Sequence, residues 1–255
     1  YTLIYGIRLG TLQTPAFGVA GAATGLTLAR TLGAVLVLIP LFRGSRQLKL
    51  SKRAYFRFDA ELQKSIFNLG VPASAEQLMF NGGKLIVQTF IVSLGTASMA
   101  ANTIANSVSS ILMVPGMALS IAAPAIVGQQ IGAGQPQQAK KQLKFLVIAA
   151  MIANTLVSLI LLPLVRSLLS LYTQDPVTLD LAVVVMLLNL LVQPLLWPSA
   201  FMIPSGLRGA GDVRYTMLVS IISMWLLRIL SGYIFAIVLQ MGILGIWLGM
   251  YADWV

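Results

Sequence analysis

Polar and charged side chains recur at helical spacing inside the long apolar stretch at residues 65–93. They are Glu76, Gln77, Asn81, Lys84 and Gln88. At about 100° per residue, the last four fall on one stripe of a helix and Glu76 lies at its edge. In a helix that crosses a membrane, such side chains normally face the bundle interior or a water-filled cavity. We therefore expect the stripe to line a cavity for a small molecule, and hydrogen bonding that holds helices together is the alternative.

Glu76 is the residue best suited to carry an ion. It is the only carboxylate deep inside a complete apolar span, and a carboxylate that binds and releases a proton is what an ion-coupled transporter requires. A permanent ion pair is the alternative role. Lys84 is a poor partner, because the eight residues that separate it from Glu76 rise by about 12 Å in a helix. Arg30 and Arg228, which lie inside other apolar spans, are the remaining candidate partners.

Further polar side chains lie inside the other spans. Asn102 and Asn106 belong to a polar face of the span at 99–127, and either cavity lining or close helix packing accounts for that face. Arg30 and Arg228 each carry a charge into a span, where a charge normally faces protein or water rather than lipid. We include all four among the candidate residues of a substrate cavity.

The residue types that are missing exclude several classes of chemistry. The chain contains no His and no Cys, so it has no imidazole or thiolate metal site, no Cys nucleophile and no Ser–His pair. Its seven Asp and Glu residues leave little for general acid–base catalysis. We expect neither an enzyme nor a bound cofactor or metal.

The elements that position the polar residues are apolar helices. Of the 255 residues, 58% are apolar and 9% charged, whereas soluble domains carry about 25% charged residues. A membrane span needs about 20 apolar helical residues. Apolar runs lie at 1–10, 17–42, 65–93, 99–127, 143–165, 177–203 and 213–239, and another begins at 242. They do not alternate as β-barrel strands do, so the sequence predicts an all-α polytopic membrane protein, with 1–10 the end of a span.

Basic residues concentrate in alternate connections between these runs. One set of connections holds Arg43, Arg46, Lys49, Lys52, Arg53, Arg57, Lys64, Lys140, Lys141, Lys144, Arg208 and Arg214. The other holds only Arg8 and Arg166. The positive-inside rule places the first set, in loops 43–64, 129–142 and 205–214, in the cytoplasm. The net charge of +10 thus indicates topology and a lipid bilayer as partner, rather than nucleic acid.

Three motifs give the chain a resemblance to a known family. Leu69-Gly70-Val71-Pro72 opens the span of Glu76. Val127-Gly128-Gln129-Gln130-Ile131-Gly132-Ala133-Gly134 follows Pro115. Pro204-Ser205-Gly206-Leu207-Arg208-Gly209-Ala210-Gly211-Asp212 is the third. With these motifs the chain resembles, over essentially its whole length, the multidrug and toxic compound extrusion (MATE) family of secondary transporters. The candidate loop residues are Gly128, Gln129, Gly132, Gly134, Gly206, Arg208, Gly209, Gly211 and Asp212.

The resemblance implies a fold of two six-helix lobes around a central cleft. Residues 1–42 would then end the N-terminal lobe, with a partial fifth and a complete sixth helix. Residues 43–64 would be a basic cytoplasmic linker between the lobes, and 65–255 the C-terminal lobe, helices seven to twelve with the twelfth truncated. We expect the chain to be a fragment of a longer protein that is monomeric and lies in the bacterial inner membrane.

The resemblance also implies efflux of amphipathic organic compounds or drugs in exchange for inward protons or sodium, by alternating access. Many members carry an essential acid in the seventh helix where this chain has Phe80, one turn after Glu76. Some carry another acid in the tenth helix, where this chain offers Asn189 and Gln193. We therefore expect Glu76 to be the coupling residue, Asn189 and Gln193 to belong to the substrate cavity, and protons rather than sodium to be the coupling ion.

The third motif, taken with Met224-Trp225-Leu226, is similar to a bacterial branch that includes flavin nucleotide exporters. The substrate candidates are thus organic cations, which are typical of the family, and flavin nucleotides (FMN or FAD), whose anionic groups suit Lys84, Arg30 or Arg228. A passive membrane channel or a lipid scramblase is the alternative function.

Overall fold

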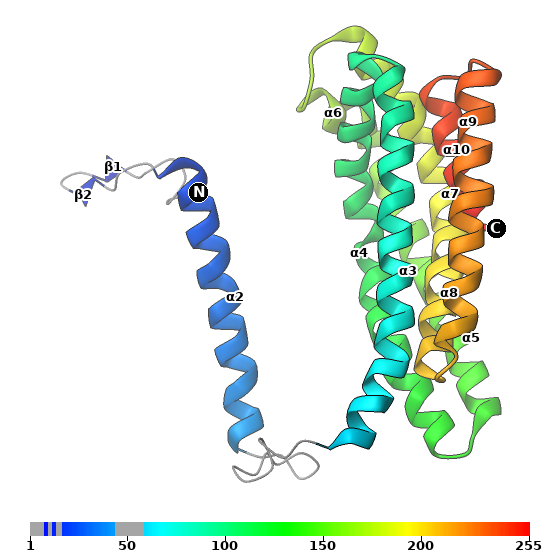
Figure 1. The fold of residues 1–255 in the computed structure, drawn as a ribbon. Coiled ribbons are helices and arrows are strands. Elements are labelled where there is room, and N and C mark those ends of the chain that lie inside the picture. Colours follow the sequence, from blue (N-terminus) through cyan, green and yellow to red (C-terminus); the bar gives the residue numbers. More distant parts are fainter. Residues whose placement is uncertain (1–7, 10–11, 14–16, 44–58) are drawn as a thin grey trace. The chain divides into compact units, whose positions relative to one another are not determined.

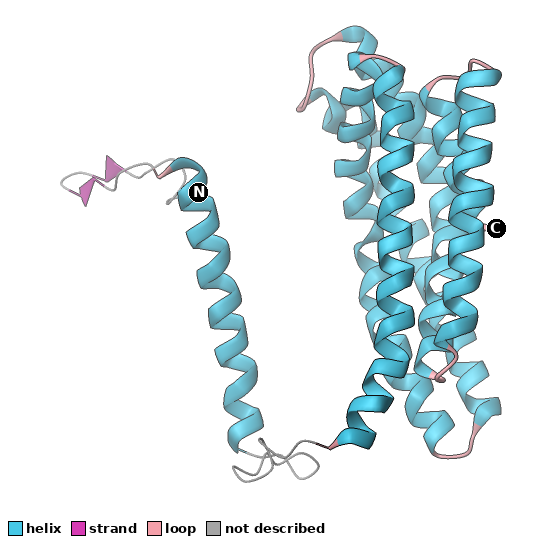
Figure 2. Ribbon diagram, viewed as in Figure 1, coloured by secondary structure: helices cyan, strands magenta, loops and turns pink. Residues whose placement is uncertain are grey.

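The structure is a computed structural model that describes residues 8–9, 12–13, 17–43 and 59–255 (Figure 1). The chain divides between Leu62 and Gln63 into two units. Figure 2 shows that helices make up nearly all of the described part of each unit.

In the part of the first unit that the structure describes, the main element is one long helix, α2 (Gly18–Arg43). Before it lie the two-residue strands β1 (Arg8–Leu9) and β2 (Leu12–Gln13), which pair antiparallel. Apolar side chains project from α2 in all directions; Leu32 is 63% exposed and Leu36 68% exposed. A helix that is apolar all round requires lipid or protein about it, and the predicted helix at 17–42 is confirmed.

The predicted end of a helical span within residues 1–10 is wrong for Arg8 and Leu9, which form β1. Gly6 and Gly10 flank these residues, and each glycine in a helix costs about 1 kcal/mol relative to alanine. Residues 1–7 and 10 of that predicted span, and residues 44–58 of the predicted linker at 43–64, lie outside the described residues.

The second unit is a bundle of long helices. Its elements are most of α3 (Ala60–Ser93), α4 (Thr96–Gly132), α5 (Pro136–Leu161), η1 (Leu162–Leu164), α6 (Val165–Ser170) and α7 (Pro176–Gly209). There follow α8 (Val213–Ile222), the π-helical η2 (Ser223–Ile229), α9 (Leu230–Tyr233), the π-helical η3 (Ile234–Val238) and α10 (Ile243–Trp254). The segment from α8 to η3 is helical throughout.

α7 lies at the centre of the packing, because it contacts α4, α5, α6, α8 and α10. The side chains of Leu112, Met186 and Met202 are completely buried between these helices. Many outward-facing side chains are apolar, such as Ile121 at 77% exposure and Leu191 at 70%. An apolar exterior over an apolar core is the pattern of a protein whose solvent is lipid.

Five helical segments within the described residues are long and apolar enough to cross a membrane. They are Gly18–Ile39, Thr96–Gly132, Pro136–Ser170, Pro176–Gly209 and Val213–Val238. α3 is long enough, but the polar stripe interrupts its apolar surface and it is not among them. The protein is therefore an all-α polytopic membrane protein, as the sequence predicts.

The helices extend further than the predicted runs, and the connections are correspondingly short. α3 begins at Ala60 because the carboxylate of Asp59 accepts hydrogen bonds from the N–H groups of Glu61 (3.0 Å) and Leu62 (3.2 Å), an N-cap. Of the predicted loops 129–142 and 205–214, only 133–135 and 210–212 are not helical.

Those two connections have the same backbone geometry. Each contains the sequence Gly-Ala-Gly, and the second glycine has a positive φ, 72° at Gly134 and 93° at Gly211. The next N–H, of Gln135 or Asp212, donates to the carbonyl five residues earlier at 2.9 Å and 3.0 Å respectively. Glycine adopts this left-handed conformation without a steric penalty, so the helix ends abruptly with its carbonyls satisfied.

Charge is distributed unequally between the two ends of the second unit. Figure 1 shows the start of α3 and the α4–α5 and α7–α8 connections at one end, and the α3–α4, α6–α7 and η3–α10 connections at the other. The first end carries Lys64, Lys140, Lys141, Lys144, Arg208 and Arg214, with Asp212. The second carries Arg166 with Asp175 and Asp180. The fold thus gathers the basic residues at one end, here named the basic end; that it faces the cytoplasm stays a prediction.

Candidate functional site

α3 carries the predicted polar stripe along the surface of the second unit. Gln77, Asn81, Lys84 and Gln88 are all exposed, whereas Glu76, one residue off the stripe, has only 9% of its surface exposed. Two cavities lie along this helix. Lys84 and Gln88 line one, Glu76 and Gln77 line the other, and Asn81 lines neither.

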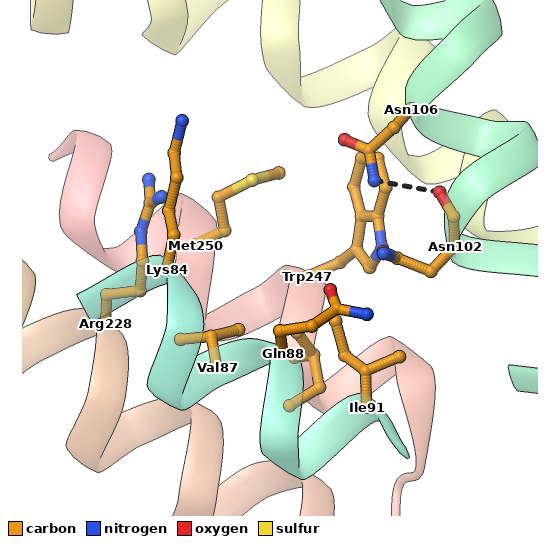
Figure 3. Close-up of a pocket in the computed structure, with 10 residues that line it drawn as sticks. Lys84, Val87, Gln88, Ile91, Asn102, Asn106, Arg228, Trp247 and Met250 are labelled. Atoms are coloured by element: carbon orange, nitrogen blue, oxygen red, sulfur yellow. Dashed lines mark hydrogen bonds between the residues drawn. The ribbon is translucent and has the colours of Figure 1, made fainter. Parts of the chain in front are cut away.

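The first cavity, here named the Lys84 cavity, has a volume of about 240 Å³ and lies between α3, α4, η2 and α10 (Figure 3). Its polar lining residues are Lys84, Gln88, Asn102, Asn106, Arg228 and Trp247, and its apolar ones are Val87, Ile91, Ile246 and Met250. The side-chain oxygen of Asn102 accepts a hydrogen bond from the indole N–H of Trp247 at 3.2 Å. The side-chain amide of Asn106 donates to the backbone carbonyl of Asn102 at 2.8 Å. The cavity thus brings together predicted candidates from three separate elements.

The second cavity, here named the Glu76 cavity, has a volume of about 730 Å³. Its polar lining residues are Glu76, Gln77, Ser199, Arg208, Ser220, Ser223 and Asp253. Oε1 of Glu76 lies 3.7 Å from Nη2 of Arg208, whose side chain is 38% exposed. Oε2 of Glu76 is buried and has no hydrogen-bond partner among the described residues. Within the second unit the carboxylate therefore has one loose, partly solvated partner, and that partner is not Arg228 but Arg208, the arginine of the third motif.

Arg228 forms a buried ion pair with Asp253. Nη2 of Arg228 lies 2.6 Å from Oδ2 of Asp253, and each side chain is only 8% exposed. The hydroxyl of Ser223 also donates to Oδ1 of Asp253, at 2.6 Å. The pair joins η2 to α10 at a point where η2 is π-helical, a distortion that is frequent at functional sites.

Asp253 is not among the residues that the sequence predicts for the site, although its signal is present in the sequence. An acid and a base placed in two different apolar helices predict a pair, since either charge alone is costly in lipid.

The ring of Phe80 lies close to both cations of the Lys84 cavity. Nζ of Lys84 is 4.8 Å from the centroid of the ring, and the guanidinium carbon of Arg228 is 5.3 Å from it. Both distances are typical of cation–π contacts. Phe80 stands at the position where the family resemblance places an acid, and its ring stabilises the same two cations through its π-face instead.

Asn189 and Gln193 do not line either cavity, contrary to the prediction. Both are completely buried. The amide nitrogen of Asn189 donates to Ser109 Oγ (2.8 Å) and to Gln193 Oε1, and its oxygen accepts from the Tyr251 hydroxyl at 3.2 Å. The physical reason is the central place of α7, since α4 and α10 cover the face that carries these amides. They form a hydrogen-bond network that links three helices.

The glycines of the two loop motifs let helix ends approach closely. A Cβ on Gly209 would lie 2.4 Å from the carbonyl oxygen of Pro124, and one on Gly128 would lie 3.0 Å from the carbonyl oxygen of Gly209. A Cβ on Gly206 would lie 2.7 Å from Leu143. The ends of α4 and α7 are therefore packed backbone against backbone, and the side chain of Leu143 in α5 packs against the backbone of α7.

The remaining motif residues have simpler places. Asp212 caps α8 by accepting a hydrogen bond from the N–H of Tyr215 at 3.4 Å, and Gln129 and Gly132 are exposed. Of the nine motif candidates, only Arg208 lines a cavity. Arg30 lies in α2 of the first unit with an exposed side chain, and its part in a substrate cavity stays a prediction.

Comparison with known proteins places these features in a family. The MatE family model matches residues 72–234, well over half of the chain. The chain is 29% identical over 251 residues to the uncharacterized transporter YisQ of Bacillus subtilis, covering 98% of this chain and 54% of YisQ. It is 26% identical over 251 residues to the probable multidrug resistance protein NorM of Thermotoga maritima, covering 98% and 53%. The chain thus spans about half the length of the curated relatives it matches.

Solved structures share the fold. One is an outward-facing multidrug resistance MATE family transporter of the MOP superfamily, with a TM-score of 0.83, 19% identity, and coverage of 93% of this chain and 53% of that one. Another is MATE in complex with MaL6, with a TM-score of 0.82, 20% identity, and coverage of 99% and 55%. Motifs, family match and fold agree, and the chain belongs to the MatE family, the transporter family that its motifs resemble.

Proposed function

We propose that the whole protein is a secondary active efflux transporter, which exports amphipathic organic compounds or drugs in exchange for inward protons by alternating access. The names of its relatives support multidrug efflux. The observation that carries ion coupling is Glu76, a carboxylate buried beside a large cavity, with one oxygen unpaired and the other 3.7 Å from a partly exposed arginine.

The geometry suits a proton better than a sodium ion. The guanidinium of Arg208 repels a metal cation at Glu76, whereas a proton on the carboxylate simply removes the attraction between the two groups. Arg208 belongs to the motif where the ends of α4 and α7 are in backbone contact. Protonation of Glu76 therefore removes an electrostatic attraction that links α3 to the end of α7. Proton binding would thus bias the helix arrangement at that end.

The proposal includes an orientation. The basic end, with the α4–α5 and α7–α8 connections, faces the cytoplasm of a bacterial inner membrane, in agreement with the positive-inside rule and with the bacterial relatives. The full-length protein acts as a monomer. Its substrates are organic cations or flavin nucleotides, which contact the amides and aromatic rings of the two cavities.

Export by the full-length protein in sealed vesicles tests the coupling. With an imposed pH gradient, the wild type should export an ethidium-like cation or FMN. Glu76→Gln should fold but lose most gradient-driven export, because its amide cannot release a proton. Glu61→Gln is the matched control, since it makes the same change on the same helix at an exposed position, and should export normally.

Two results would contradict parts of this proposal. Gradient-driven export that is unchanged in Glu76→Gln would exclude Glu76 from coupling. Equal substrate flux with and without a gradient would identify a passive channel or a scramblase instead. Separate proton and sodium gradients decide the coupling ion.

A further inference from the structure

The Lys84 cavity carries positive charge without a carboxylate of its own. Its lining includes Lys84 and Arg228 but neither Asp nor Glu. No carboxylate of the described residues lies within 4.0 Å of Lys84, and the remaining residues, 1–7, 10–11, 14–16 and 44–58, contain no Asp or Glu. Because Asp253 neutralises Arg228, the cavity has the net charge of Lys84, one positive charge.

Arg228, which lines the same cavity, has one donor without a partner among the described residues. It is only 7% exposed, and its Nη2 is committed to Asp253. Its Nε is buried and has no hydrogen-bond partner among the described residues. A buried donor of a charged group that lacks a partner is unfavourable, so a ligand oxygen at this point would satisfy it.

The remaining lining residues and the volume of the Lys84 cavity indicate what kind of ligand it could hold. In Figure 3, the side chains of Lys84 and Arg228 run alongside each other, and the amides of Asn102 and Asn106 lie across the pocket from them. Gln88 adds a further amide, and Trp247, Ile91 and Met250 add apolar surface. The volume of about 240 Å³ is less than the roughly 300–1,000 Å³ of a pocket for a whole drug-sized ligand. It suits the charged end of an amphipathic molecule.

We propose that the Lys84 cavity binds the carboxylate or phosphate group of an organic anion, and that organic anions are therefore a substrate class of this transporter. Lys84 supplies the charge that the anion neutralises, Arg228 Nε donates a hydrogen bond, and Trp247 contacts the apolar body. The assignment of organic anions as a substrate class rests on the proposed efflux function, whereas the anion-binding site itself does not.

The two cavities differ in a way that supports this assignment. A cation in the Lys84 cavity would meet repulsion from Lys84 and no compensating carboxylate. Glu76 and Asp253 both line the Glu76 cavity, but each faces an arginine, Arg208 and Arg228 respectively. The carboxylates of the Glu76 cavity are therefore balanced by arginines, whereas the Lys84 cavity has a positive charge that an organic anion can neutralise.

Equilibrium binding of two probes of matched size tests the proposal. The full-length protein in nanodiscs of neutral phosphatidylcholine is titrated with 1-naphthoate and with 1-naphthylmethylammonium in a calorimeter. We expect naphthoate to bind at least about tenfold more tightly than the ammonium, the effect of one charge-assisted hydrogen bond. Lys84→Met should lower naphthoate affinity by a similar factor, whereas Lys84→Arg should retain most of it. Lys140→Met, at an exposed position of α5, should change nothing.

Equal binding of both probes, a preference for the ammonium, or unchanged naphthoate affinity in Lys84→Met would each overturn the proposal. Nanodiscs that contain phosphatidylglycerol separate two sources of the anion. Competition by this lipid would show that a lipid phosphate enters the same site, and its absence would favour a soluble anion. Because binding needs no gradient, Glu76→Gln should still bind naphthoate, so failure of the anion site and failure of proton coupling are distinguishable.

Discussion

The ion pair between Arg228 and Asp253 should be the strongest polar link between η2 and α10. The perturbation is a double-mutant cycle with Arg228→Met and Asp253→Leu, which replace each charged side chain by an apolar one of similar size. Each single variant leaves the other charge buried, since both side chains are only 8% exposed in the pair. Removing one partner of a buried pair costs roughly 3–5 kcal/mol, whereas replacing both by apolar groups is often close to neutral.

The structure contains its own reference pair for this cycle. Arg166 and Asp180 form an ion pair at 3.4 Å, with side chains 71% and 65% exposed. An exposed pair contributes about 0–1 kcal/mol. The cycle with Arg166→Met and Asp180→Leu should therefore give a small coupling energy, whereas the buried cycle should give more than about 2 kcal/mol.

The measurement is the free energy of unfolding of the full-length protein in mixed micelles, titrated with a denaturing detergent. We expect both single variants of the buried pair to unfold much more readily than the wild type, and the double variant to be more stable than either. A coupling energy as small as that of the exposed pair would refute the reasoning, because it would mean that water or lipid headgroups reach the two charges.

Two further predictions concern the helix ends. Gly209→Ala should destabilise the protein by about 1–3 kcal/mol, because the new Cβ would lie 2.4 Å from Pro124 O; Gly132→Ala, with no atom within 4 Å of the new Cβ, should change the same unfolding free energy by less than about 0.5 kcal/mol. The hydroxyl and N–H of Thr178 donate to Asp175 and hold the pKa of that carboxyl below its usual value. The stabilisation is therefore present above the usual pKa of an aspartate and is lost as the pH falls through the lowered one. Unfolding at a series of pH values should show the wild type losing stability relative to Asp175→Asn on acidification, and a constant difference would count against the cap.

The helical bundle is predictable from the sequence because lipid leaves the backbone no alternative. Every N–H and C=O within the hydrocarbon must be paired inside the segment, so an apolar run of sufficient length predicts a helix. The helix ends are harder to predict, since local contacts set them. Asp59 starts α3 before the apolar run begins, and Gly134 and Gly211 hold the connections at the basic end to three residues each.

The residues of the site are predictable in part, and their partners are not. The period of the α3 stripe follows from helix geometry, so Lys84 and Gln88 could be placed on one face from the sequence alone. Which charge pairs with which depends on the packing of helices that are far apart in the chain. The contacts of Glu76 with Arg208 and of Arg228 with Asp253 follow from that packing. So does the burial of Asn189 in a network rather than at a cavity.

The position of the acid on α3 has a consequence for the charge of both cavities. An acid at position 80 would stand beside Lys84 and Arg228, since the ring of Phe80 lies within 4.8 Å and 5.3 Å of the two cationic groups, and it would neutralise the free charge of Lys84. With the acid one turn earlier, at Glu76, the carboxylate lines the other cavity and faces Arg208 instead. The aromatic ring then stabilises the two cations without neutralising them. The departure from the family pattern thus separates a carboxylate suited to carrying a proton from a positive charge suited to holding an anion, about two turns apart on one helix.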